Sequence, residues 1–272
     1  AFQKYCKMDQ SMFTRLIRLG VPCIQLNAQG RARPELAKLY SWKYRNLGDL
    51  PCTARGMYEL ANPGFAHEFQ FVNVDDYRGS GETEPTPHFY QNIGEAEYIV
   101  SVYQYMRLLG YPASKIAIIA TYRGQKHLIR DIVARRCAHH PLFGAPSRVT
   151  TVDKFQGQQN EYVLLSLVRT RRIGHMRDIR RLIVALSRAR LGLYVFGREA
   201  LFRRSVELSP SFQHLLKFPT KLALVPTEAF PGARQKAEKR IPYLVEDPVA
   251  MGRVVNQLVW QSVEQSQPFK ID

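Results

Sequence analysis

The stretch that decides the fold reads Val149-Thr-Thr-Val-Asp-Lys-Phe-Gln-Gly-Gln-Gln-Asn-Glu-Tyr-Val-Leu-Leu-Ser-Leu-Val168. It opens with β-branched residues and closes with an apolar run from Tyr162, and both patterns are typical of buried strands. Between them lies a polar segment, residues 153–161, with one glycine and three glutamines, which we call the elbow. Two interpretations of the elbow are open: it is a solvated turn, or its backbone and amide side chains face a ligand.

The alternation seen in this stretch continues along the chain, where short apolar runs are separated by segments with apolar residues at helical spacing. Near-continuous apolar strands joined by helices indicate a parallel sheet that is covered on both faces. The sequence therefore predicts an α/β fold with helices on both faces of a parallel sheet. The expected strands are 69–74, 115–120, 148–152, 162–168 and 191–196, and the expected helices are 93–109, 124–136 and 177–189.

The N-terminal part of the chain is less regular. We expect a helix at 10–19, a short strand at 21–26, and a second helix that starts near Pro34, because proline suits the first helical position. Residues 61–90, rich in glycine, proline and acidic residues, are expected to form an irregular insertion.

Beyond residue 206 the strand–helix alternation weakens. We expect residues 207–272 to form a C-terminal extension. It would contain a flexible basic linker at 226–242 and a terminal amphipathic helix at 247–264.

Charge and cysteine content narrow the function. The 272 residues carry a formal net charge of +16 and a pI near 9.9, which favours an anionic partner such as nucleic acid, with simple solubility as the alternative. The four cysteines form no Cys-x-x-Cys pair, so we predict no metal site and reduced, intracellular thiols. No apolar run reaches the length of a membrane span, and we predict no membrane association.

Three polar clusters follow predicted strands, where ligands bind in parallel sheets. They are Thr121–Gln125, the elbow, and Arg169–Arg172. The arginines from 169 to 181 have two interpretations: a solvated helix start, or contacts to phosphates. The usual phosphate loop and acidic metal box are absent, because the sequence has no Gly-Lys and no Asp-Glu dipeptide. By that route the chain does not bind and split a nucleoside triphosphate alone.

Four segments, in order, resemble motifs of superfamily 1 helicases. Residues 29–36 (Gln-Gly-Arg-Ala-Arg-Pro-Glu-Leu) resemble the Gln-Tyr-Arg-Met-His-Pro motif, and 121–125 (Thr-Tyr-Arg-Gly-Gln) resemble Thr-Pro-Tyr-x-x-Gln. Residues 149–166 resemble Thr-Val-Asp-x-Phe-Gln-Gly-x-Glu, and 181–190 (Arg-Leu-Ile-Val-Ala-Leu-Ser-Arg-Ala-Arg) resemble Asn-Val-Ala-Leu-Thr-Arg-Ala. The elbow and the Ser-Leu-Val-Arg-Thr-Arg segment that follows resemble the intron-binding RNA helicases of the spliceosome in particular.

This resemblance implies that residues 1–206 are the second of two RecA-like domains. The first domain, with the phosphate loop and the Mg²⁺ ligands, would lie upstream of Ala1, and ATP would bind between the two. The implied activity is that of an ATP-dependent RNA helicase in pre-mRNA splicing, inactive without its upstream domain. The implied partners are single-stranded RNA, including intronic RNA, and spliceosomal proteins, and the implied location is the nucleus.

The resemblance also assigns roles to individual residues. Arg31 and Arg188 would be arginine fingers that reach the γ-phosphate. The elbow would lie between ATP and RNA, with its first residues toward the RNA and its last toward the nucleotide. The nucleotide-binding residues implied are Gln29, Gln156, Gly157 and Gln159, and the RNA-binding residues implied are Thr121, Tyr122, Thr151 and Arg169.

Three positions depart from the motifs. Gln159 stands where the family has a glutamate that touches the ribose, Gly30 where it has a tyrosine, and Ser187 where it has a threonine. The first two changes keep an alternative open, in which the fold serves as an RNA or protein platform with weak or lost ATP turnover. A relationship to DNA helicases or nucleases is the other alternative, and Arg31 and Arg188 are ordinary surface arginines in the simplest interpretation.

Overall fold

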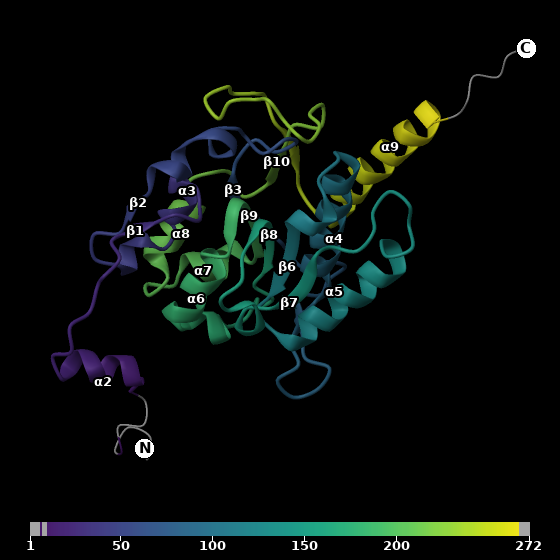
Figure 1. Ribbon diagram of the computed structural model, residues 1–272. Coiled ribbons are helices and arrows are strands. Elements are labelled where there is room, and N and C mark those ends of the chain that lie inside the picture. The colour runs from purple at the N-terminus through teal and green to yellow at the C-terminus, as the bar shows by residue number, and fades with distance from the viewer. Residues whose placement is uncertain (1–5, 7–9, 267–272) are drawn as a thin grey trace, which may run out of the picture.

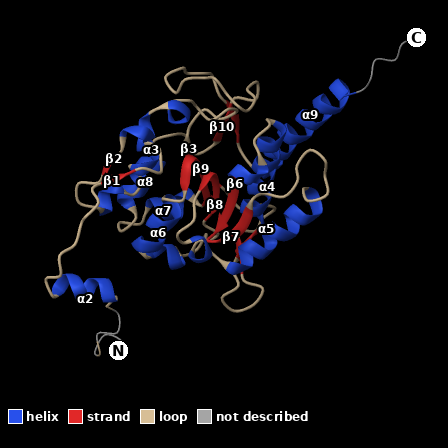
Figure 2. Ribbon diagram, in the orientation of Figure 1, coloured by secondary structure: helices blue, strands red, loops and turns tan. Residues whose placement is uncertain are grey.

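The computed structural model describes residue 6 and residues 10–266. Its centre is a five-stranded parallel sheet, seen in red in Figure 2. All neighbouring strands of this sheet run in the same direction. In sheet order the strands are β3 (Phe69–Asn73), β9 (Ala189–Gly197), β8 (Asn160–Ser166), β6 (Ile116–Ala120) and β7 (Arg148–Thr151).

The strands are buried on both faces. In β6, Ile116 and Ile118 belong to one hydrophobic cluster, and Ala117 and Ile119 belong to the other. Because successive side chains of a strand point to opposite faces, an uninterrupted apolar run is needed where both faces are covered. The near-continuous apolar strands of the sequence therefore have a direct structural cause.

Helices cover both faces of the sheet, as Figure 1 shows. This RecA-like α/β arrangement confirms the predicted fold class. The helices on the first face are α4 (Ile93–Leu108), α5 (Arg123–Arg136) and α9 (Pro248–Ser266). Those on the second face are α3 (Pro34–Ala37), α6 (Ile179–Leu186), α7 (Glu199–Arg203) and α8 (Ser209–Leu215).

The boundaries of α4 follow from local chemistry. The side chain of Asn92 accepts a hydrogen bond from the backbone N–H of Glu95 at 3.1 Å, which satisfies a donor that the first helical turn leaves free. After the helix, Gly110 adopts a φ of 95°, a conformation that glycine reaches without steric cost. The helix predicted at 93–109 is confirmed, with Asn92 as its N-cap.

The predicted strand at 21–26 is wrong. These residues form no strand, and the side chains of Ile24 and Leu26 are 93% and 83% exposed, so the segment has neither a strand partner nor a face to bury. The short strand of this region comes later, where β1 (Ala28–Gln29) pairs with β2 (Gly48–Asp49). The predicted helix at 10–19 is present as α2 (Met12–Arg18), which stands apart from the body of the fold in Figure 1.

Short strands lie within the segment expected to be irregular at 61–90, where β3 matches the strand predicted at 69–74, and on either side of the linker expected at 226–242. The 61–90 region contains β3 and β4 (Glu82–Thr83), and β4 pairs with β5 (Gln91–Asn92). In the C-terminal part β10 (Leu222–Leu224) pairs with β11 (Tyr243–Val245).

Short 3-10 turns join the elements: η1 (Ser41–Lys43), η2 (Pro51–Ala54), η3 (Gly56–Tyr58), η4 (Ala113–Lys115), η5 (Asp153–Phe155) and η6 (Gly174–Arg177).

The C-terminal helix packs against one of the helices that cover the sheet. Helix α9 lies against α4, and Met251, Val254 and Val255 join the same hydrophobic cluster as α4. Residues 226–242 are largely irregular, but Arg234 forms an ion pair with Glu228. Across the described part of the chain, no helix combines the length and the apolar character that crossing a lipid bilayer requires.

Candidate nucleotide and RNA site

The elbow crosses the domain from one edge of the sheet to the other. Thr151, the last residue of β7, pairs with Ala120, the last residue of β6. Asn160, the first residue of β8, pairs with Ala189, the first residue of β9. Because the strands are parallel, Thr151 lies at the carboxyl edge and Asn160 at the amino edge. The sequence pattern alone had placed the whole elbow at the carboxyl ends of strands, whereas its second half lies toward the opposite edge.

At the amino edge the structure brings Arg31 and Arg188 together at Ser187. The guanidinium of Arg31 donates to the carbonyl oxygen of Ser187 at 3.2 Å, and Nη2 of Arg188 donates to its hydroxyl oxygen at 2.8 Å. Arg188 also donates from Nε to the carbonyl oxygen of Val184 at 2.7 Å and from Nη1 to that of Gln158 at 3.0 Å. Two residues 157 positions apart in sequence therefore form one site.

The two guanidinium groups have no acidic partner. Among the described residues, no carboxylate lies within 4.0 Å of either Arg31 or Arg188. Burial lowers the pKa of Arg188, and the positive charge of Arg31 lowers it further. An anion placed between them would remove this repulsion, so the pair fits a phosphate group.

Gln29 holds the loop that carries Arg31. Its side-chain oxygen accepts hydrogen bonds from the backbone N–H groups of Arg31 and Ala32, both at 2.8 Å. Its amide nitrogen donates to the carbonyl oxygen of Ala32 and to the carboxylate of Asp49. Both the oxygen and the nitrogen of this amide are hydrogen-bonded within the protein. The Gln29 side chain therefore fixes the position of the Arg31 backbone.

The other residues assigned to the nucleotide lie on the turn that leads into β8. Gln156, Gly157 and Gln159 are exposed. Gly157 adopts a φ of 77° with no atom near the position of an added Cβ, so its backbone angle explains the glycine. The carbonyl oxygen of Gln158, inside this turn, is the one that Arg188 binds, which ties the turn to the arginine pair.

At the carboxyl edge three predicted RNA-binding residues line one pocket of about 240 Å³. They are Thr121, Tyr122 and Thr151. The hydroxyl of Thr121 donates to the carbonyl oxygen of Leu167 at 2.9 Å, which fixes the end of β6 against the chain that follows β8. The pocket also carries basic side chains from three elements: Arg123, Lys154 and Arg181.

Tyr122 is a wall of this pocket and is only 4% exposed. Its ring stacks on the ring of His175 with centroids 4.9 Å apart, and its hydroxyl oxygen accepts the backbone N–H of His175 at 3.0 Å. Gly174 lies against it, because an added Cβ there would come within 2.0 Å of the Tyr122 hydroxyl. Tyr122 therefore supports the loop after β8.

Arg169, the fourth predicted RNA-binding residue, is committed to an internal ion pair. Its guanidinium donates two hydrogen bonds to the carboxylate of Glu82, at 2.9 and 3.2 Å, and lies 3.9 Å from the centre of the Tyr90 ring. Burial opposes its charge, but the bonds to Glu82 outweigh burial and raise the pKa of Arg169, while they lower the pKa of Glu82. Sequence reasoning missed Glu82, which sits 87 positions away on the insertion.

A buried polar network below the carboxyl edge was also missed. The carboxylate of Glu95 accepts hydrogen bonds from the Ser166 hydroxyl at 2.6 Å and from the backbone N–H of Val168 at 2.9 Å. Gln125 donates to the Ser166 hydroxyl and to the backbone carbonyl of Asn92. The Asn-x-x-Glu pattern at 92–95 is typical of a helix N-terminus, but nothing in it indicates that the glutamate reaches β8.

With the fold and this geometry in place, the comparison with known proteins is direct. Residues 8–200 match the protein family described as AAA domain. The chain belongs to this family. Its resemblance to superfamily 1 helicases, predicted from the four motifs, is thereby confirmed, and the motifs fall within the matched range.

Two relatives from splicing are similar over most of the chain. RNA helicase aquarius of Mus musculus is 58% identical over 240 residues, which cover 88% of this chain and 16% of that protein. Pre-mRNA-splicing factor cwf11 of Schizosaccharomyces pombe is 35% identical over 227 residues, which cover 83% of this chain and 18% of that protein. The predicted resemblance to the spliceosomal intron-binding helicases is confirmed at the level of sequence.

A further relative is named as a DNA helicase. The 5'-3' DNA helicase ZGRF1 of Mus musculus is 27% identical over 207 residues, 76% of this chain and 11% of that protein. The chain thus spans less than a fifth of the length of each of these relatives. The chain is therefore a member of the helicase family that covers a small part of each of these relatives.

Proposed function

We propose that the chain is the C-terminal motor domain of an ATP-dependent RNA helicase that acts in pre-mRNA splicing in the nucleus. ATP would bind between this domain and an upstream RecA-like domain, which would supply the phosphate loop and the Mg²⁺ ligands. The relatives named for splicing support this assignment. Single-stranded RNA, including intronic RNA, and spliceosomal proteins are the proposed partners.

The observation that carries the nucleotide part of this proposal is the uncompensated pair at Ser187. The guanidinium groups of Arg31 and Arg188 both donate hydrogen bonds to Ser187, and no carboxylate among the described residues lies near them. When two domains close around a triphosphate, arginines donated across the interface stabilise the charge on the transferring phosphoryl group. Arg188 is anchored to the elbow through Gln158, so a shift of the elbow is transmitted to the arginine.

The elbow gives a physical route between nucleotide and RNA. Its first turn lines the carboxyl-edge pocket with Thr121 and Thr151, where the RNA would lie. Its last turn contacts Arg188 at the amino edge. RNA that moves the first turn would therefore move the phosphate-binding arginine, which couples strand binding to hydrolysis.

The test is the Arg188→Ala substitution in the full-length protein. RNA-stimulated ATP hydrolysis should fall by about 10³-fold or more, while the affinity for single-stranded RNA stays close to that of the wild type. Arg203→Ala, at an exposed arginine paired with Glu199, is the matched control and should keep full activity. ATP hydrolysis at the wild-type rate by Arg188→Ala would overturn the assignment.

A second candidate is a helicase fold that binds RNA or protein with weak or lost ATP turnover. Two observations favour it: Gln159 presents an exposed amide at the position of the family's carboxylate, and the space beside Gly30 is taken by Leu50, whose Cδ1 lies 2.8 Å from an added Cβ. Gln159→Glu separates the candidates. It should tighten ATP binding severalfold if the ribose is bound there, because charge-assisted hydrogen bonds are about twice as strong as neutral ones.

The DNA-helicase alternative draws on the relative named as a DNA helicase. Competition between ribose and deoxyribose strands of the same base sequence distinguishes it. Preferential displacement of bound RNA by the deoxyribose strand would favour that alternative over the RNA helicase.

A further inference from the structure

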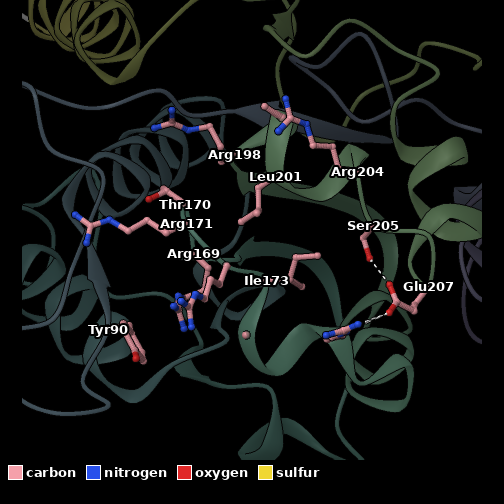
Figure 3. Close-up of a pocket in the computed structure, with 14 residues that line it drawn as sticks. Tyr90, Arg169, Thr170, Arg171, Ile173, Arg198, Leu201, Arg204, Ser205 and Glu207 are labelled. Carbon is pink, nitrogen blue, oxygen red and sulfur yellow. Dashed lines mark hydrogen bonds and ion pairs between the residues drawn. The ribbon is translucent and has the colours of Figure 1, made fainter.

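A wide basic hollow lies beside the carboxyl-edge pocket, and of its arginines only Arg169 belongs to the site described above. Its volume is about 870 Å³, and Figure 3 shows its lining. One acidic residue, Glu207, contributes to the lining. We call this hollow the arginine basin, and it is lined by Arg169, Arg171, Arg172, Arg177, Arg198 and Arg204.

Three of the six arginines are neutralised by carboxylates. Arg169 is bound to Glu82, Arg177 is bound to Glu207 at 2.9 Å, and Arg198 is paired with Asp76. Their positive charges are paired with carboxylates of the same protein.

The other three arginines of the basin carry free charge. Arg171, Arg172 and Arg204 are exposed, and within the described chain no carboxylate lies within 4.0 Å of their guanidinium groups. In Figure 3 Arg171 and Arg204 stand on different sides of the basin, with Leu201 between them. Unpaired guanidinium groups spread around a hollow form a surface for a chain with repeated negative charges rather than for one compact anion.

The basin adjoins the carboxyl-edge pocket across one wall. The residues that follow β8 form a common wall: Gly174 lines the basin, while its neighbour His175 lines the pocket. Tyr122 and Arg169 meet in this wall through a 3.4 Å contact between the Tyr122 hydroxyl and Nη1 of Arg169. A strand that lies in the pocket and crosses this wall enters the basin.

We propose that the arginine basin binds the phosphates of the RNA strand as it continues beyond the pocket formed by Thr121 and Thr151. Arg171, Arg172 and Arg204 make these contacts, and the paired arginines shape the basin. This inference rests on the proposed RNA-binding function. The position of the basin next to the pocket favours RNA over an acidic peptide as the occupant, since one strand can cross the wall and contact both hollows.

The test compares two triple variants of the full-length protein, each with three positive charges fewer. The first is Arg171→Gln, Arg172→Gln and Arg204→Gln. The control is Arg136→Gln, Arg180→Gln and Arg203→Gln, at arginines outside the basin that are paired with Glu97, Asp178 and Glu199. Binding of oligouridylates of increasing length is measured over a range of salt concentrations.

For long oligouridylates, the negative slope of log affinity against log salt should become shallower by about 2 in the basin variant, because each lost phosphate contact on a single strand contributes about 0.7. The control variant should keep the wild-type slope. Oligouridylates too short to leave the Thr121–Thr151 pocket should bind the wild type and the basin variant equally.

Three results would overturn the proposal: an unchanged slope in the basin variant, an equal loss in both variants, or an equal loss for short and long strands. Displacement of long oligouridylate by an acidic peptide but not by unlabelled RNA would assign the basin to a protein partner and overturn it as well. A different result would show that the proposed motor function fails while the basin proposal stands. In that case the wild-type protein would bind oligouridylate, but RNA would not stimulate its ATP hydrolysis.

Discussion

Arg31 and Arg188 bind the same residue, Ser187, one through its carbonyl oxygen and the other through its hydroxyl oxygen. They come from segments at opposite ends of the domain sequence and lie side by side without an acidic neighbour in the described structure. Folding places two like charges together only where other interactions compensate or where a ligand supplies the missing charge. We therefore expect the two guanidinium groups to serve a bound phosphate, and the first prediction concerns Arg31.

Arg31→Ala should greatly reduce ATP hydrolysis and leave the stability of the fold almost unchanged. In the full-length protein the substitution should reduce RNA-stimulated ATP hydrolysis by about 10³-fold or more, because one of two phosphate-binding guanidinium groups is lost. The free energy of unfolding should change by no more than about 0.5 kcal/mol, because a partly exposed charge without an ion pair is removed. Steady-state ATPase assays and urea unfolding measure the two effects. Wild-type turnover together with a large loss of stability would assign Arg31 a structural role only.

Glu82→Gln should destabilise the fold by about 3 kcal/mol, because it leaves the buried guanidinium of Arg169 without its counter-charge. The side chains of this pair are only 6% and 10% exposed. Glu207→Gln is the matched control, since its pair with Arg177 is exposed to solvent, and it should change stability by less than about 1 kcal/mol. Urea unfolding of both variants gives the comparison, and equal effects would contradict the role of burial.

Glu95→Gln should change the pH dependence of stability. Burial raises the pKa of the Glu95 carboxyl from 4.5 to about 7. The folded state therefore holds this proton more tightly than the unfolded state, so the stabilisation is complete below pH 4.5 and is lost as pH rises to about 7. Over that range the wild type should lose about 3 kcal/mol relative to the variant.

Urea unfolding of both proteins across this pH range measures the Glu95 effect. The difference in unfolding free energy should change steadily with pH in favour of the variant. Parallel pH profiles for the two proteins would show that Glu95 is ionised in both the folded and the unfolded state.

Gly174→Ala tests the wall between the pocket and the basin. Gly174 has a φ of 64°, and an added Cβ would lie 2.0 Å from the Tyr122 hydroxyl. Gly144 also has a φ of 64° but has no atom within 4 Å of that position, so Gly144→Ala reports backbone strain alone. That strain is worth about 1 kcal/mol, and Gly174→Ala should cost at least about 1 kcal/mol more, because Tyr122 must move.

The same variant should weaken RNA binding, because Tyr122 supports the pocket that contains Thr121 and Thr151. Unfolding and oligouridylate binding are measured for both glycine variants. An equal loss of stability in the two would show that Tyr122 yields without cost, and would remove this glycine from the architecture of the pocket.

Much of the fold followed from local pattern, for a clear physical reason. A strand such as β6, buried on both faces, must be apolar throughout, and this makes it visible in the sequence. The strand expected at 21–26 was wrong because a run of apolar residues does not create a pairing partner. Sequence cannot supply hydrogen bonds that depend on another segment.

In the candidate site, too, some features follow from local sequence and others depend on a distant segment. The motifs selected Thr121, Tyr122 and Thr151, and the structure gathers these three into one pocket. It also removes Arg169 from the set of freely charged residues, through Glu82. Nothing local to Arg169 indicates this partner, because the pair closes only when the insertion folds over the end of β8.

Residue patterns alone predict the α/β class, the five strands of the central sheet, the excess of positive charge and the helicase family of this chain. Each of these depends on residue type and short-range spacing. Only the tertiary structure decided which arginines carry free charge, which edge of the sheet each half of the elbow faces, and that Arg31 meets Arg188. These depend on distances between segments far apart in the chain, and electrostatic energy is set by those distances and by burial.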